Sequence, residues 1–484
     1  MMKRVFQIGM PLFLLFSAVC AQTLQTEPER KLIFSGNAAA LGVHHVFDGI
    51  LLEAGKNGSV KIPDKFKKSG YNFLKTDTAV LSSDWFDERA WQQTLAYYAR
   101  LCRLVRQTGC RGLVLDTRSQ NARLPFAVRP RGKYSVDAVR RQVRNRGREW
   151  IKTAAENCPG IEIVFTLWLN GLKDVSPADD MFLLADFASG VLEGAPNTVK
   201  IIDGNGQILS GRRMADLREV AAAFYLNAPG VVPDIARNKL FRISGVAVPL
   251  ALNYYAPDRI SELREDIQSG METADSYVFL NCSGRDWYKK YPHLQEVLFG
   301  GKDPVAAAVR FSAGENLLKN GNFTPGIQMG NPEPDTCHFG ASYWFSWQDN
   351  RKKQGKILLE KEGAAFRGTA KGTVIQTLYN IRPGELLLLT GRVKYQGNSL
   401  SATFSCNFRD QKNKFMRYSQ VKTSPGKPDS KGWRHAAVIV EVPAGMKYMI
   451  VNAGVSSGMF APDEQDVCHI TDIRLRRIVY PWNK

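Results

Sequence analysis

The stretch Gly112-Leu113-Val114-Leu115-Asp116 shows the pattern that decides the fold: a short apolar run that ends directly at an acid. The same pattern recurs in Gly49–Glu53 (GILLE), Asn72–Asp77 (NFLKTD) and Val199–Asp203 (VKIID). Near-continuous apolar runs between helical segments are typical of parallel strands that are covered on both faces. In a barrel of such strands, the polar residues at the carboxyl ends meet in one mouth, where the chemistry of barrel enzymes takes place.

The sequence predicts eight strands before residue 290. They span residues 31–35, 49–54, 72–77, 112–117, 161–167, 199–204, 245–252 and 276–282. Apolar residues at helical spacing predict helices over residues 86–107, 135–156, 181–188, 214–227, 260–273 and 303–311. This alternation predicts an α/β fold, a (β/α)8 TIM-type barrel. An open α/β sheet is the alternative, because only a short connector separates the first two strands.

The sequence pattern changes after about residue 312, where long helical patterns no longer occur. Short alternating strands follow, separated by turn residues such as Pro383-Gly384 and Pro425-Gly426. This pattern predicts an all-β sandwich of the jelly-roll type. The expected organisation is therefore a signal peptide over residues 1–21, a barrel over 30–311 and a sandwich over 315–480.

The amino terminus has the features of a targeting segment. Lys3 and Arg4 precede an apolar stretch over residues 11–16, and Val19-Cys20-Ala21 fits a small-residue cleavage site. Lipid attachment at Cys20 is the alternative to cleavage. Later stretches are shorter than the roughly 18 apolar residues of a membrane span. We therefore expect an exported protein, periplasmic or extracellular, with no transmembrane segment.

The formal net charge is +19, and nine basic residues fall between Arg123 and Arg148. This cluster has three interpretations: a solvated helix face, a surface for an acidic polysaccharide, or a nucleic-acid site. Nucleic acid is disfavoured, because an exported protein rarely meets it and no platform of aromatic and basic residues appears. The sequence also lacks a glycine-rich phosphate loop, a Gly-x-Ser-x-Gly elbow and zinc-type cysteine spacing. We expect no cofactor and no metal.

The C-terminal region resembles the jelly-roll carbohydrate-binding modules of secreted polysaccharide-degrading enzymes. The matching residues are Asn316–Phe323 (NLLKNGNF), Leu389–Tyr395 (LTGRVKY) and Thr471–Leu475 (TDIRL). This resemblance implies a sandwich that binds glycan or braces its neighbour. Within it, Tyr343, Phe345 and Trp347 are expected on one face of a strand and Trp344 on the other.

The N-terminal region resembles an exported glycoside-hydrolase-type (β/α)8 domain. The stretches that carry this resemblance are FDGI (47–50), DWFD (84–87), GLVLD (112–116), FASGVLE (187–193), IDGN (202–205) and RDWY (285–288). The resemblance implies glutamates at three places of the mouth, where this chain instead has Arg118, Gly206 or Gln207, and Gly284.

Glycoside hydrolysis uses two carboxyl groups that flank one bond. The strand-end acids Asp116, Asp203 and Glu53 are the catalytic candidates, with Asp116 and Asp203 as the best pair across the mouth. Aromatic rings, amides and charged groups at the strand ends are the candidates for substrate binding: Asp77, Trp168, Asn170, Asn253, Tyr254, Asn281, Trp287 and Arg118.

The hypothesis is an exported glycan-active protein, a glycoside hydrolase acting on a polysaccharide or oligosaccharide, with acidic glycans included among its candidate ligands. Two alternatives stay open: a barrel that binds carbohydrate without hydrolysis, and a surface protein that binds polyanions.

Overall fold

The computed structural model divides the chain into two compact units, residues 1–302 and 303–484. The expected leader with Cys20 lies outside the described residues, and so do Arg118 and Trp287. The structure describes residues 30–36, 46–53, 60–77, 84–117, 126–127, 133–172, 175–176, 179–205, 214–282, 290–291, 293–330, 332–333, 335–349, 355–397, 400–422, 428–456, 463 and 465–481.

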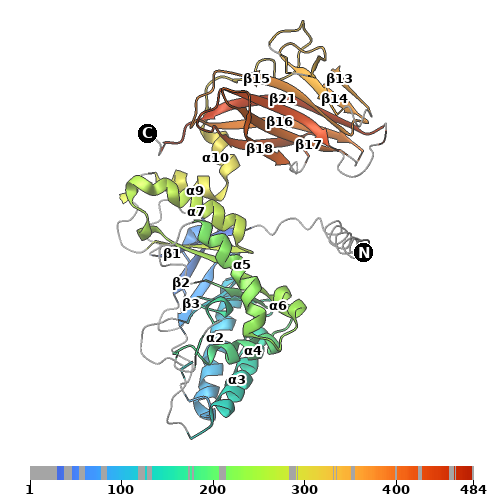
Figure 1. Cartoon of the computed structure of the whole chain (residues 1–484). Coiled ribbons are helices and arrows are strands. Elements are labelled where there is room, and N and C mark those ends of the chain that lie inside the picture. The colour runs from blue at the N-terminus through green and yellow to red at the C-terminus, as the bar shows by residue number, and fades with distance from the viewer. Residues whose placement is uncertain are drawn as a thin grey trace, which may run out of the picture. The chain divides into compact units, whose positions relative to one another are not determined.

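One sheet of parallel strands forms the centre of the first unit, in the order β7-β6-β5-β4-β3-β2-β1-β9-β8 (Figure 1). β7 and β8 stand at opposite ends of this order, yet only Ala247 separates them in the chain, so the sheet returns on itself as a near-closed barrel. Counting β7 and β8 as one interrupted strand gives eight, which confirms the (β/α)8 prediction. The strands are β1 (Lys31–Gly36), β2 (Gly49–Glu53), β3 (Phe73–Asp77), β4 (Gly112–Asp116), β5 (Glu162–Phe165), β6 (Lys200–Asp203), β7 (Ser244–Val246), β8 (Val248–Ala251) and β9 (Tyr277–Cys282).

The helices of this unit begin and end at residues that the sequence marks. Asp87 caps α2 by accepting the amide of Ala90, and Gly109 ends the helix with a left-handed φ of 68°. Ser135 caps α3 in the same way. The sequence prediction missed α6 and α9 and ended α4 six residues too early. The helices are α2 (Glu88–Thr108), α3 (Val136–Asn157), α4 (Leu184–Gly194), α5 (Met214–Val231), α6 (Arg237–Ile243), α7 (Ile260–Thr273) and α9 (Leu294–Lys302).

Helices α3 and α4 approach each other through glycines. A Cβ atom on Gly190 would lie 1.9 Å from the carbonyl oxygen of Arg144, and one on Gly147 would lie 2.4 Å from that of Phe187. Neither position accepts a larger residue without moving a helix backbone. The glycines of α4, which weaken helix propensity in the sequence, are therefore explained by close packing.

The amino-terminal end of the barrel is closed by a buried polar group. The Glu162 carboxylate is 2% exposed, accepts a hydrogen bond from the Tyr277 hydroxyl at 2.7 Å and pairs with Arg111 at 2.6 Å. Above it, one inner layer of apolar side chains fills the barrel: Ile33, Phe73, Val114, Val164, Ile202 and Ala247. The interior is packed at this end.

The second unit is a sandwich of two antiparallel sheets, which confirms the predicted jelly-roll-type fold (Figure 1). One sheet has the order β13-β14-β21-β16-β19, and the other has the order β11-β12-β15-β20-β17-β18. Asn316 of the opening motif accepts the amides of Leu318 and Leu475, which ties the start of the unit to its last strand. The elements are α10 (Pro304–Phe311), β10 (Ser312–Ala313), β11 (Cys337–His338), β12 (Phe345–Gln348), β13 (Lys356–Glu360), β14 (Gly363–Arg367), β15 (Lys371–Leu378), β16 (Leu386–Gln396), β17 (Ser401–Arg409), β18 (Phe415–Lys422), β19 (Arg434–Glu441), β20 (Tyr448–Ser456) and β21 (Val467–Ile478).

The aromatic stretch of the sandwich differs from the expected alternation. Trp344 is fully buried in the core, but Phe345, expected on the opposite face, is also buried. Trp347 packs on a separate small cluster with Ile375 and Tyr448. Tyr343 precedes β12 and has φ 67°, so it does not share the face of this strand.

The described cysteines are all free thiols; six are buried and Cys337 is exposed. The described part of the chain contains no group of three acidic, histidine or cysteine side chains that could hold a metal ion. Within the same residues, no helix is both long enough and apolar enough to cross a membrane.

Candidate functional site

A cavity of about 390 Å³ opens at the carboxyl ends of the barrel strands. Its polar lining comes from five strand ends around the barrel, and the rest is apolar. The lining residues are Ser35, Leu51, Lys75, Val114, Asp116, Val164, Thr166, Gly204, Pro249, Leu250, Phe279 and Asn281. A single basin at this end is where barrel folds place their binding sites.

Strand register decides which acids reach this cavity. Leu115 pairs with Phe165, and Phe165 pairs with Asp203, so Asp203 lies level with Leu115 and one residue below Asp116. Neighbours in register share a face of the sheet, and successive residues alternate between faces. Asp116 therefore lies on the inner face, whereas Asp203 lies on the outer face between Ile202 and Gly204. The expected arrangement of Asp116 and Asp203 across one mouth does not occur.

Asp116 is the centre of a small polar group in the mouth. The Lys75 ammonium lies 3.6 Å from its Oδ2, and the Thr166 hydroxyl donates to its Oδ1 at 3.3 Å. Both partners line the cavity with it. Among the described lining residues, Asp116 is the one carboxylate. These groups offer hydrogen-bond donors and acceptors to the basin, and Ser35 and Asn281 supply the rest of its polar lining.

Asp203 instead holds the loops that frame the mouth. It is 1% exposed, and its two carboxylate oxygens accept the backbone amides of Asn170 and Asn205, each at 2.9 Å. The Asn205 side chain donates to the Ala247 carbonyl at 3.0 Å and accepts from Asn170 at 3.0 Å. Burial raises the pKa of Asp203 to about 6, although the backbone amides oppose this change. Asp203 thus links β5, β6 and the seam between β7 and β8.

The structure separates most of the other predicted site residues from the cavity. Glu53 pairs in register with Lys75, which gives it inner-face parity, but it is exposed at the end of β2 and is not part of the cavity lining. Asn253 and Tyr254 are exposed in the 3-10 turn η7 (Leu252–Tyr254). Trp168 is fully buried, with its ring stacked on Phe165 at 3.9 Å. A ring in this place fills the core.

Two of the predicted binding residues lie at the mouth of the barrel. Asn281 lines the cavity. The backbone of Asp77 pairs in register with Asp116 at the end of β3, and its side chain lies outside the described residues.

Sequence reasoning missed Ser35, Lys75, Thr166 and Phe279, which line the cavity. Two of them could have been predicted from the sequence, because Lys75 lies two residues before Asp77 and Phe279 lies two residues before Asn281. Counting back by two from a strand end stays on one face of the strand.

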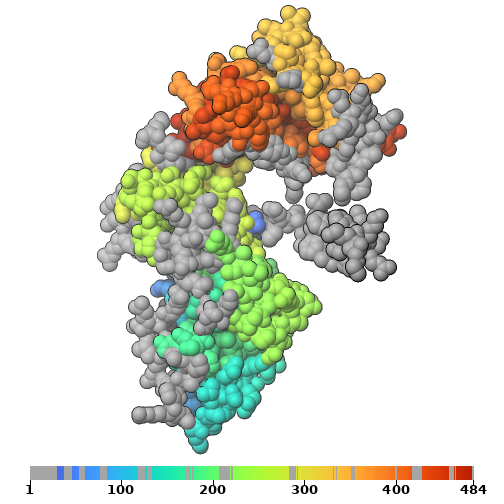
Figure 2. Space-filling view, viewed as in Figure 1, coloured from blue at the N-terminus to red at the C-terminus, as the bar shows by residue number. Residues whose placement is uncertain are grey.

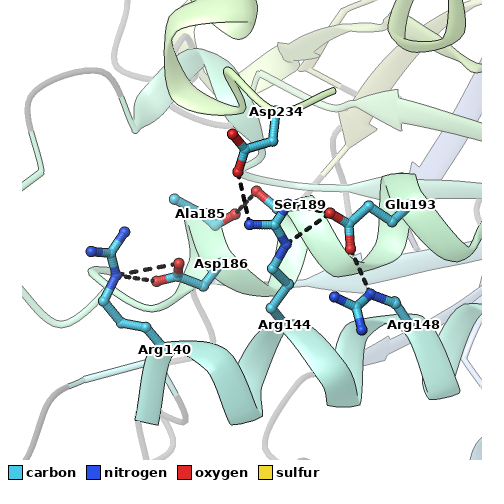
Figure 3. A network of polar contacts seen from close by, with 8 residues as sticks. All are labelled: Arg140, Arg144, Arg148, Ala185, Asp186, Ser189, Glu193 and Asp234. Atoms are coloured by element: carbon cyan, nitrogen blue, oxygen red, sulfur yellow. Dashed lines mark hydrogen bonds and ion pairs between the residues drawn. The ribbon is translucent and has the colours of Figure 1, made fainter. Parts of the chain in front are cut away.

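The basic cluster on α3 is largely neutralised by acids of the same unit. In Figure 3, Arg140, Arg144 and Arg148 project from successive turns of α3 toward Asp186 and Glu193 of α4. Arg140 pairs with Asp186 at 3.0 Å, Arg148 pairs with Glu193 at 2.5 Å, and Arg144 contacts Glu193. Burial pushes the pKa of Glu193 upward, but its arginine hydrogen bonds outweigh burial and hold that pKa below its usual value.

Further ion pairs of α3 bear on the interpretation of its charges. Arg144 also pairs with Asp234 at 2.8 Å, and Arg146 on the same helix pairs with Glu88 and Glu149. α3 forms part of the outer surface of the barrel unit (Figure 2, teal). Its charges mainly join helices to each other, which weakens the interpretation of this helix as a polyanion surface.

No family model matches the chain, and no curated protein matches it. Solved structures with similar parts include the enzymatically active domain of bacteriophage CBA120 tailspike protein 4, at 16% identity over 34% of this chain and 21% of that chain, with a TM-score of 0.22. This chain thus spans about a fifth of the length of that domain.

Two further solved structures cover their own chains almost completely. The CBM22-1 xylan-binding domain of Paenibacillus barcinonensis Xyn10C matches at 15% identity over 35% of this chain and 98% of its own, with a TM-score of 0.24. A D-tagatose 3-epimerase-like protein matches at 12% identity over 57% of this chain and 99% of its own, with a TM-score of 0.35. At these identities and TM-scores, the likenesses carry no argument about what this chain binds.

Proposed function

We propose that this chain is an exported carbohydrate-binding protein whose barrel mouth holds a sugar unit. The observation that carries the proposal is the composition of the mouth. Asp116, Lys75 and Thr166 form a connected polar group on one side, and Phe279 with Pro249 forms an apolar wall. A sugar has the same two-sided character, with hydroxyl groups at its edges and C–H groups on its faces. A few placed polar groups in an apolar basin are the usual design of a small-ligand site.

Binding without hydrolysis fits the described cavity lining better than the two-carboxyl mechanism, because Asp116 is the one carboxylate of that lining and Glu53, on the same inner face, lies exposed outside it. That mechanism requires a second carboxyl group on the other side of the scissile bond. Asp203, the expected partner of Asp116, faces away from the mouth and uses both oxygens to hold backbone amides. Its raised pKa of about 6 would suit a general acid, but a group buried among loops has no path to a bound sugar.

The proposal is tested by calorimetric titration of the purified chain with xylohexaose, cellohexaose, mannohexaose and laminarihexaose. We expect binding of at least one oligosaccharide, with affinity reduced about tenfold or more in Asp116→Asn and in Phe279→Ala. Glu156→Gln is the matched control. Glu156 is exposed near the end of α3 that leads into β5, and therefore at the closed end of the barrel.

The same samples are assayed for newly formed reducing ends. Binding without turnover, sensitive to both mouth variants, supports the proposal. Turnover that disappears in Asp116→Asn would replace it with the hydrolase hypothesis. Binding that Glu156→Gln weakens as much as Asp116→Asn would remove the mouth from consideration.

A further inference from the structure

The end of the barrel opposite the mouth carries an excess of positive charge. Parallel strands all begin at the same end of a barrel, so the segments at the starts of β3, β4, β5 and β6 meet there. These segments, residues 60–72, 103–111, 152–162 and 195–200, contain nine lysines and arginines and three acids. We call them the basic surface. We propose that the basic surface docks on the headgroups of an anionic phospholipid bilayer.

A connector with four exposed lysines forms the first part of the basic surface. Asn72, which is 2% exposed, fixes this connector: its Nδ2 donates to the carbonyl oxygens of Phe66 at 2.8 Å and of Ser69 at 3.2 Å. The Asn72 carbonyl oxygen accepts the amide of Arg111 at 2.7 Å, which sets the connector beside the start of β4. The lysines that this fixed connector carries are Lys61, Lys65, Lys67 and Lys68.

The neighbouring segments extend the positive charge across four strands. Arg103 and Arg106 are exposed in the last turns of α2, and Arg103 donates to the amide oxygen of Asn157 at 2.7 Å, a neutral partner that leaves its charge in place. Lys152 is exposed on α3, and Lys200 is exposed at the start of β6. Adjacent strands are about 4.8 Å apart, so the rim from β3 to β6 spans roughly 14 Å. This width exceeds that of one phosphate and suits a layer of headgroups.

The acids of the basic surface leave most of this charge uncompensated. Asp64 pairs with Lys67 at 2.5 Å, and the buried Glu162 pairs with Arg111. Within these described segments, Glu156 is the one exposed acid that remains. Nine cations and three acids give a formal excess of six positive charges. The arginines of α3 that face acids of α4 have no such excess.

The course of the chain favours a bilayer over a soluble polyanion. β1 begins at Lys31, so the chain enters the barrel unit at the same end as the basic surface. The expected leader, with its apolar stretch over residues 11–16 and Cys20, precedes this point. A retained leader or a lipid on Cys20 would hold this end toward a membrane, and a single apolar anchor becomes stable when a polybasic patch acts with it. The mouth then opens away from the bilayer, where a sugar can reach it.

The test is co-sedimentation of the full chain with vesicles of phosphatidylcholine that contain about 30% phosphatidylglycerol. We expect binding in about 50 mM NaCl and at least tenfold weaker binding to vesicles of pure phosphatidylcholine. Raising the salt to about 500 mM NaCl should release the chain, because salt screens the attraction between exposed charges.

A triple charge reversal tests whether the basic surface makes the contact. Lys61→Glu, Lys68→Glu and Arg106→Glu together should weaken vesicle binding about a hundredfold or more, since each cation near an anionic surface contributes about fivefold. The charge-preserving combination Lys61→Arg, Lys68→Arg and Arg106→Lys should bind as the wild type does. Circular dichroism at 222 nm checks that both variants are folded.

The matched control changes the net charge equally at another place. It combines Lys412→Glu, Lys414→Glu and Lys431→Glu, which replace exposed lysines of the sandwich unit, and it should bind the vesicles as the wild type does. The mouth variant Asp116→Asn should also leave vesicle binding unchanged. Failure of this proposal and failure of the barrel-mouth proposal are therefore distinguishable.

Four outcomes would overturn the proposal. The first is equal binding to vesicles with and without phosphatidylglycerol. The second is binding that survives the triple charge reversal or is lost equally in the sandwich control. The third is release by about 10 mM glycerol 3-phosphate at constant ionic strength, which would indicate a site for a single anion. The fourth is tighter binding to alginate than to the vesicles, which would assign the basic surface to an acidic polysaccharide.

Discussion

Replacing Asp203 with asparagine tests the role of the buried carboxyl group at the seam of the barrel. Burial raises its pKa from 3.8 to about 6 in the folded protein. The folded state therefore holds the proton more tightly than the unfolded chain, and stability from this group is greatest at low pH. This contribution of Asp203 to the free energy of unfolding is lost as the pH rises from about 4 through 6, and it does not change further at higher pH.

The size of this effect follows from the two pKa values. A difference of about 2 at roughly 1.4 kcal/mol for each unit of pKa corresponds to about 3 kcal/mol, of which about 2 kcal/mol falls between pH 4 and pH 7. Asparagine does not titrate, so the stability of wild type relative to Asp203→Asn should fall by this amount over that range. At every pH, the variant also loses an acceptor for one of two buried amides, at a cost of about 1–3 kcal/mol.

Urea unfolding followed by circular dichroism at 222 nm provides the assay. Nearly all described helices belong to the barrel unit, so this signal reports its unfolding. The free energies of unfolding of the two proteins are compared at pH 4, 5, 6 and 7. A difference between them that stays constant across these values would refute a raised pKa for Asp203.

Three further predictions concern packing and charge. Gly190→Ala should lower the free energy of unfolding by about 1–3 kcal/mol in the urea assay, because its Cβ would lie 1.9 Å from the Arg144 carbonyl oxygen. The control Gly230→Ala should be neutral or stabilising, because there is open space around Gly230. Equal losses of stability in the two variants would contradict the packing argument. Glu162→Gln should cost about 1–3 kcal/mol at pH 7, since the buried carboxylate that accepts from Tyr277 is lost; an unchanged urea midpoint would be inconsistent with this closure of the barrel. Arg144→Ala should destabilise the barrel yet elute from a heparin column at the same salt concentration, and markedly earlier elution would restore the polyanion interpretation of α3.

The barrel strands could be predicted from the sequence because short apolar runs that alternate with helices are characteristic of a parallel sheet. The run at Gly112–Asp116 predicted both β4 and an acid in the mouth, and both are present. The run that ends at Asp203 looks the same in the sequence but is set one residue lower in the sheet. Register between strands is a property of the assembled barrel, and a difference of one residue turns a side chain to the other face.

Other parts of the structure could not be predicted for similar reasons. α4 contains glycines that are typical of a helix end, and their purpose appears only when α3 lies against them. Tyr343 belongs to an aromatic stretch that is typical of a strand, and its positive φ breaks the alternation. Close approach and left-handed backbone both depend on residues far along the chain.

The most direct test of the central claim is a crystal structure of the full chain with the hexasaccharide that binds most tightly. We expect a sugar unit in the barrel mouth, with hydroxyl groups within hydrogen-bond distance of Asp116 and Lys75 and one face against Phe279. A sugar found only away from these three residues, or an empty mouth at a saturating ligand concentration, would contradict the claim.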